Sequence, residues 1–209
     1  MAKGRRRIDG MADGPKTLFI ACGALAKEFL AVSKASGWDD RVEITCLPAI
    51  WHNRPEKIAP GVQRKIRAGR KKFDRIFVLY GDCGTGGELD RVLAEEGVER
   101  IDGPHCYQWF AGTADFEKMM DEEPGTFFLT DYLARHFERL IWQGFGIEKH
   151  PELRDMYFGN YRKLAYLAQT DDADLLQRAR AAAERLNLEF VHRRTGYGEF
   201  ADFMRQKMV

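Results

Sequence analysis

Short apolar runs alternate with amphipathic segments along most of the chain. The apolar runs predict strands at residues 17–21, 42–47, 75–80, 100–101, 126–129, 164–169 and 189–193. Segments rich in helix-forming residues predict helices at 24–35, 55–73, 88–96, 105–110, 115–120, 131–142, 151–160, 170–186 and 200–208. This alternation is typical of an α/β fold with a mainly parallel sheet flanked by helices, doubly wound as in Rossmann-like or flavodoxin-like proteins.

Residues 1–16 lack this pattern and predict a flexible N-terminal tail, which leaves 17–209 as a single α/β domain. Hydrophobic residues make up 44% of the 209, too many for a disordered chain, and no apolar run is long enough to span a bilayer. The 33 basic and 32 acidic residues nearly cancel, so we expect no nucleic-acid or membrane partner. The basic stretch 64–75 is interpreted as the solvated face of a helix.

Four cysteines and a basic start without a following apolar stretch predict a cytoplasmic protein with reduced thiols. Cys22 follows the first predicted strand and Cys83 the third, while His52 lies in the loop after the second. His105 and Cys106 follow the short fourth strand. Because the carboxyl ends of parallel strands meet at one edge of a sheet, we expect all five residues to converge there.

Thiolates and imidazoles are the ligands that zinc prefers, and thiolates also hold iron–sulfur clusters. Cys22, Cys83 and Cys106, with His52 or His105, therefore predict a metal site that is either zinc or an iron–sulfur cluster. No C-x-x-C pair supports this locally, so it depends on the topology alone, and three separate half-buried thiols are the alternative. Cys46 lies inside a strand, where inert packing is expected.

The densest motif is the glycine-rich stretch 81–90, which joins a strand to a helix. Backbone amides of Gly84, Thr85, Gly86 and Gly87 are predicted to hold a substrate or its anionic group. The N-terminus of the following helix favours the Cys83 thiolate. Cys83 is thus also a candidate nucleophile, with His105 or His52 as its base and the loop amides as an oxyanion site.

Other polar and aromatic residues have structural explanations. Glu28 falls about two turns into a predicted helix, where a solvated carboxylate is expected. His136, His150 and His192 are each interpreted as structural. The stretch 157–161 combines aromatic residues with glycine, which favours ordinary packing over the wall of a pocket.

Several of these strings together resemble an uncharacterised bacterial and archaeal family, catalogued as domain of unknown function 1638. They are residues 21–25, 52–56, 80–87, 105–107, 125–131, 150–154, 157–161 and 195–198. The resemblance implies an association with corrinoid-dependent methyl transfer and one-carbon metabolism, and a corrinoid protein or a methyltransferase as partner. It carries no agreed catalytic residues.

Three hypotheses remain open at this point. The first is a metal-binding enzyme or accessory factor in corrinoid-linked one-carbon metabolism. The second is a metal-free enzyme that uses Cys83 as nucleophile on a small-molecule substrate. The third is a module that binds or delivers a corrinoid or a metal without turnover.

Overall fold

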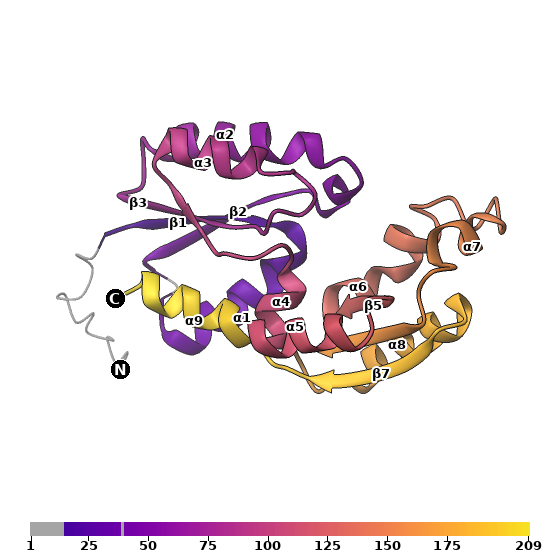
Figure 1. Ribbon diagram of the computed structural model, residues 1–209. Coiled ribbons are helices and arrows are strands. Elements are labelled where there is room, and N and C mark those ends of the chain that lie inside the picture. Colours follow the sequence, from indigo (N-terminus) through magenta and orange to yellow (C-terminus); the bar gives the residue numbers. More distant parts are fainter. Residues whose placement is uncertain (1–14, 39) are drawn as a thin grey trace, which may run out of the picture.

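The computed structural model, which describes residues 15–38 and 40–209, contains two parallel sheets (Figure 1). The α/β class with parallel sheets flanked by helices is confirmed, but the strands are divided between two sheets rather than gathered in one. Residues 1–14 of the expected tail lie outside the described residues. Lys16 donates its backbone N–H to Asp74 at 2.8 Å, so the end of the predicted tail is already tied to the first sheet.

The first sheet has the strand order β2-β1-β3-β4. Its strands are β1 (Thr17–Cys22), β2 (Val42–Leu47), β3 (Arg75–Leu79) and β4 (Glu99–Arg100). All six residues of the central strand β1 are buried, as expected for a parallel strand that is covered on both faces. Figure 1 shows α2 (Ile58–Gly69) and α3 (Glu88–Glu96) on one face, and α1 (Ala26–Ser36) and α9 (Gly198–Lys207) on the other.

The second sheet has the order β5-β6-β7 and its own core. Its strands are β5 (Thr126–Thr130), β6 (Lys163–Ala168) and β7 (Glu189–Arg194). The helices around it are α5 (Thr113–Glu122), α6 (Asp131–Phe137), α7 (Leu153–Phe158) and α8 (Ala173–Leu186). We call β1–β4 with α1–α4 and α9 the first lobe, and β5–β7 with α5–α8 the second lobe.

The helix α4 (Cys106–Ala111) joins the two lobes. Its Trp109 and Phe110 are buried in the core of the first lobe, whereas Tyr107 packs on the second and stacks on Phe128 at 5.4 Å. The chain returns to the first lobe through α9, where Phe200 enters the same core as Trp109. The lobes are therefore held together by packing as well as by the connecting segments.

The ends of two predicted helices can be compared directly with the structure. Thr130 caps α6, as one of the two predicted caps. The predicted helix through residue 73 is wrong beyond Gly69, where α2 ends. A side-chain carbon at Gly69 would lie only 2.6 Å from the Leu18 side chain, so glycine allows the helix to pack closely on β1. The predicted helix 131–142 is interrupted: His136 leaves helical geometry, and Glu138–Trp142 forms a π-helix.

None of the helices within residues 15–38 and 40–209 combines the length and the apolar character that crossing a bilayer requires.

Candidate functional site in the cleft between the lobes

The strand register explains why the candidate residues meet. Cys22 pairs with Leu47, and Ala21 pairs with Leu79, so β1, β2 and β3 end level with one another. The segments that follow these three ends therefore leave the sheet side by side. Cys22, the 3-10 turn Ala49–Asn53 and the loop 80–87 occupy this edge, as the parallel topology predicted.

Cys22 is the most enclosed thiol of this edge, with 4% of its surface exposed. Its Sγ accepts a hydrogen bond from the Ala24 backbone N–H at 3.3 Å and thereby caps the short 3-10 turn Gly23–Leu25. Burial raises the pKa of Cys22 to about 11, since a thiolate would lose its hydration there. Cys22 is therefore a neutral thiol at physiological pH.

His52 lies between Cys22 and Cys83. Its Nδ1 is 2.9 Å from the Ala49 carbonyl oxygen and 3.9 Å from the Cys22 Sγ, and its ring stacks on Tyr80. Desolvation lowers the pKa of His52, but the hydrogen bond and charge of Cys83 and the Ala49 carbonyl outweigh it, so the net shift is upward. The imidazole thus touches one thiol, is anchored by a carbonyl, and responds electrostatically to a second thiol.

Cys83 has an unusual backbone. Its φ is 49°, in the left-handed region, and within the described residues only Asn187 is another non-glycine residue with a positive φ. Asparagine tolerates this conformation, whereas cysteine is strained by about 1–2 kcal/mol. Strained residues of this kind cluster at functional sites, where surrounding bonds hold them. Here the Cys83 N–H donates to the Pro104 carbonyl at 2.9 Å.

In the glycine-rich loop, residues 84–87 donate hydrogen bonds to the side chain of Asp82, which lies near the start of the loop. The Asp82 carboxylate accepts from the amides of Gly84, Gly86 and Gly87 at 3.2, 3.3 and 2.9 Å, and from the Thr85 hydroxyl at 2.8 Å. These bonds, led by Gly87, lower the pKa of Asp82. The carboxylate occupies the place that was predicted for an external anion. A ligand at Gly84–Gly87 stays a prediction, and it would have to displace Asp82.

His105 and Cys106 reach the same edge because the chain crosses directly over Gly81. A side-chain carbon at Gly81 would lie 2.8 Å from the Pro104 carbonyl oxygen, so only glycine permits this crossing. Burial raises the pKa of Cys106 well above its usual value, and the nearby thiols Cys83 and Cys22 add to the effect. Burial and then His52 lower the pKa of His105. All five predicted residues are thus electrostatic neighbours.

Within residues 15–38 and 40–209, no three Cys, His, Asp or Glu side chains stand in an arrangement that could hold a metal ion. Among the candidate ligands, the Cys22–His52 pair has the imidazole beside the thiol, with 3.9 Å between Nδ1 and Sγ. The structure therefore brings the five candidate residues together without forming a ligand cage from their present side-chain positions, and their role as metal ligands stays a prediction.

His52, His105 and Cys106 line a cleft of about 480 Å³ between the lobes, whereas Cys22 and Cys83 are not among its lining residues. The three lining residues form its polar side. The opposite wall is apolar and comes from the second lobe: Phe127, Tyr132, Leu133, Leu140, Ile141, Phe145 and Tyr161. A few polar groups facing an apolar wall are typical of a small-molecule site. The sequence did not predict this wall, and for the stretch that contains Tyr161 it favoured ordinary packing, because the wall depends on how the second sheet packs.

Glu28 was expected to be a solvated helix carboxylate, and this is wrong. Only 5% of it is exposed, and its Oε2 has no hydrogen-bond partner among the described residues. Burial raises the pKa of Glu28 to about 7, and the charge of Asp131 adds to the shift. The side chain lies where α1 faces α6, an interface that helix periodicity alone does not reveal.

Comparison with models of protein families gives a match. The model of a family described as "Protein of unknown function (DUF1638)" matches residues 46–204, which is more than half of the chain. The matched region includes His52, Cys83, His105 and Cys106, whereas Cys22 precedes it. No curated protein matches the chain.

Proposed function

Because the chain belongs to the DUF1638 family, whose function is unknown, we propose a function from its own cleft. The protein binds a small, largely apolar molecule between its lobes and acts on it through the thiol of Cys83, with His52 as the base. One observation carries this proposal: His52 is anchored to the Ala49 carbonyl and interacts with Cys83, whose backbone is strained.

Cys83 is the thiol best suited to react. Burial raises the pKa values of the Cys22, Cys46 and Cys106 thiols, which makes each of them a weaker nucleophile at neutral pH. Cys83 is half-buried beside His52 and has a partner that can take its proton. A nucleophile, a base and a third group that orients the base form the arrangement typical of covalent catalysis.

The proton transfer follows from the hydrogen bond to Ala49. Because the Nδ1–H of neutral His52 donates to the Ala49 carbonyl, its Nε2 is free to accept the Cys83 proton. The Cys83 Sγ then forms a bond to an electrophilic atom of the ligand. The bond from that atom to its leaving group breaks, and the leaving group keeps the electron pair.

The closed glycine loop restricts the type of reaction. Acyl transfer develops an oxyanion that needs free donors, and the amides of Gly84, Gly86 and Gly87 are already bonded to Asp82. The Cys83 amide is bonded to Pro104. This favours displacement at an electrophilic carbon or sulfur, which forms no oxyanion, over acyl transfer.

The test is the relative reactivity of the four cysteines. At pH 7, iodoacetamide should alkylate Cys83 at least about tenfold faster than Cys22, Cys46 or Cys106, because it combines access with a base. Peptide mass spectrometry after timed quenching measures the four rates in one sample of the native protein. If Cys83 reacts no faster than the free thiol of an unstructured peptide, the proposal is wrong.

A second candidate function is binding of a soft metal ion, and the Cys22–His52 contact favours it. The 3.9 Å between Sγ and Nδ1 is close to the separation of two ligands on one zinc ion. As a ligand, Nδ1 would have to lose its proton and its hydrogen bond to the Ala49 carbonyl. Cys83 and Cys22 are close enough to Cys106 for their charges to raise its pKa, which makes Cys83 and Cys106 the candidates for further ligands. The Tyr80 hydroxyl beside Cys22 is buried without a partner at hydrogen-bond geometry among the described residues. A bound ion would supply Lewis-acid or, for an iron–sulfur cluster, redox chemistry.

Metal analysis of untagged, anaerobically purified protein tests the second candidate. Zinc or iron near one site per chain is expected, with loss of most of the metal in Cys22→Ser and retention in Cys46→Ser. Metal content near zero in the wild type, or equal loss in both variants, contradicts it. The corrinoid and one-carbon context, the corrinoid-protein partner and the cytoplasmic location stay predictions.

A further inference from the structure

A second hollow of about 590 Å³ continues the cleft away from His52. Four residues line both hollows: Ala49, Ile50, Tyr132 and Leu140. The far part is bordered by the strand ends at Gly23 and Leu47 and by Arg139 of the second lobe. The two hollows therefore adjoin as one elongated cleft with an apolar middle, where His52, His105 and Cys106 line one part and Arg139 and Cys46 line the other.

The backbone of the second lobe is irregular at this arginine. His136 departs from helical geometry (φ −116°, ψ 16°), and the next turn is the π-helix Glu138–Trp142. Its wider turn is closed by the Gln143 N–H, which donates to the Glu138 carbonyl at 2.8 Å. Three successive residues of this turn, Arg139, Leu140 and Ile141, line the cleft. Single π-turns are uncommon and occur mostly at functional sites.

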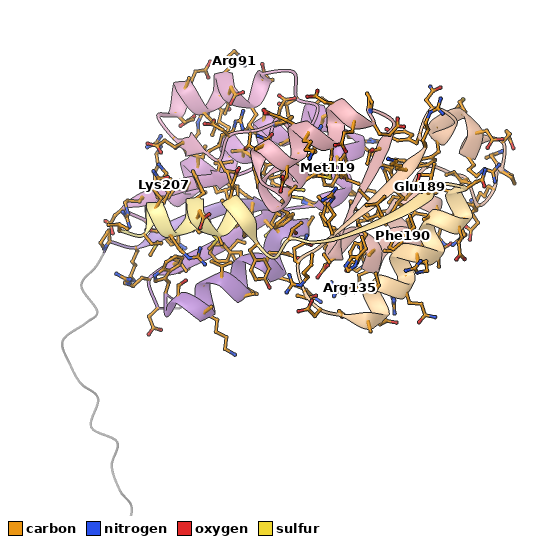
Figure 2. The ribbon with its side chains drawn as sticks, turned by 60° about the horizontal axis from the view of Figure 1, so that its bottom comes forward. Arg91, Met119, Arg135, Glu189, Phe190 and Lys207 are labelled. Carbon is orange, nitrogen blue, oxygen red and sulfur yellow. The ribbon has the colours of Figure 1, made fainter. Side chains whose placement is uncertain are left out.

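In the part of the chain that the structure describes, positively charged side chains without an ion-pair partner gather around this π-turn. Among the described residues, no ion pair joins Lys27, Arg135 or Arg139 to a carboxylate, although Arg135 lies near the partly neutral Glu28. Glu138, the neighbour of Arg139, is paired with Arg185. Arg139 instead interacts with the Tyr132 hydroxyl at the cleft wall. Figure 2 shows Arg135 where the two lobes adjoin, on the helix that leads into the π-turn.

The positive charges of these three side chains also act on His136. Burial lowers the pKa of His136, and the charges of Arg139, Arg135 and Lys27 lower it further. Unpaired guanidinium groups next to a hollow attract anions, and the planar fork of arginine matches a carboxylate.

We propose that Arg139 binds the carboxylate of the substrate, so that the cleft takes an elongated molecule with an anionic end, an apolar middle and an electrophilic end beside His52, the partner of Cys83. This inference rests on the proposed function for the position of the electrophile. The carboxylate contact itself is independent of the reactivity of Cys83, since it depends only on Arg139 and the shape of the two hollows.

Calorimetry with two unreactive probes tests the anion site. Both are N-alkyl succinimides with a six-carbon chain, one ending in a carboxylate and the other in a primary amide. The wild type should bind the carboxylate about fivefold more tightly than the amide, the preference expected of one partly exposed ion pair. Arg139→Gln should remove this preference with little change in amide binding. Arg64→Gln, an exposed arginine of α2 away from both hollows, should keep it.

Equal affinity for the two probes, or no binding of either, overturns the carboxylate site. The site is also overturned if Arg64→Gln loses the preference for the carboxylate probe as fully as Arg139→Gln does. The corresponding maleimides separate this result from the proposed function, because they report alkylation of Cys83 as well as binding. A carboxylate preference without accelerated alkylation of Cys83 would leave the anion site in place and refute the nucleophile.

Discussion

Replacing His52 with glutamine is expected to slow the alkylation of Cys83 by roughly a hundredfold at pH 7, the lower range for loss of a positioned base. Glutamine fits the same volume and can still donate to the Ala49 carbonyl, but it cannot take the Cys83 proton. The rate is measured with iodoacetamide by peptide mass spectrometry. At high pH the difference should shrink, because hydroxide then removes the thiol proton directly.

His192→Gln is the matched control. His192 is an exposed imidazole on β7 that stacks on Tyr166 of the second lobe, away from Cys83. Its replacement should leave the Cys83 rate within about twofold, since it contributes no proton acceptor to the cleft. If His52→Gln and His192→Gln give the same Cys83 rate, His52 is not the base.

Glu28 is expected to make the protein less stable as the pH rises from 4.5 towards 7. Burial raises the pKa of Glu28 from 4.5 to about 7 in the folded protein. Between these values the unfolded chain has released a proton that the folded protein still holds, so raising the pH favours unfolding. The free energy of unfolding should fall by up to about 3 kcal/mol across this window and change little above it.

Glu28→Gln should remove this slope, because an amide is neutral at every pH in the window. The variant is expected to be more stable than the wild type at pH 8 by about 2–3 kcal/mol and similar to it near pH 4.5. Urea unfolding at several pH values measures the difference. Glu117→Gln, an exposed position on α5, serves as control and should keep the wild-type slope. A wild-type slope in Glu28→Gln would show that Glu28 titrates normally.

The convergence of Cys22, His52 and Cys83 could be predicted because it depends on strand order within one parallel sheet. Each apolar run is short, and each candidate residue lies at or after a strand end, so the register alone brings them together. His105 and Cys106 were predicted at the same edge because they follow the short fourth strand, but the sequence did not reveal that the chain crosses over Gly81 to bring them there.

The parts that were missed depend on long-range packing. Nothing like a linker marks the change from the first sheet to the second, since the joining segment is the ordered helix α4. The burial of Glu28 follows from the position of α6, which comes more than a hundred residues later in the chain. The closure of the glycine loop by Asp82 is a local feature and could have been predicted. An aspartate before several glycines is a known turn signal.

The most direct test of the Cys83–His52 pair is the titration of His52 followed by NMR in the wild type and in Cys83→Ala. In the wild type the pKa of His52 is raised, and Cys83 is the main cause of the upward shift. Removing the thiol leaves desolvation as the larger effect, so the His52 pKa should fall clearly in Cys83→Ala. A His52 pKa that is the same in both proteins would contradict the pairing from which the proposed chemistry follows.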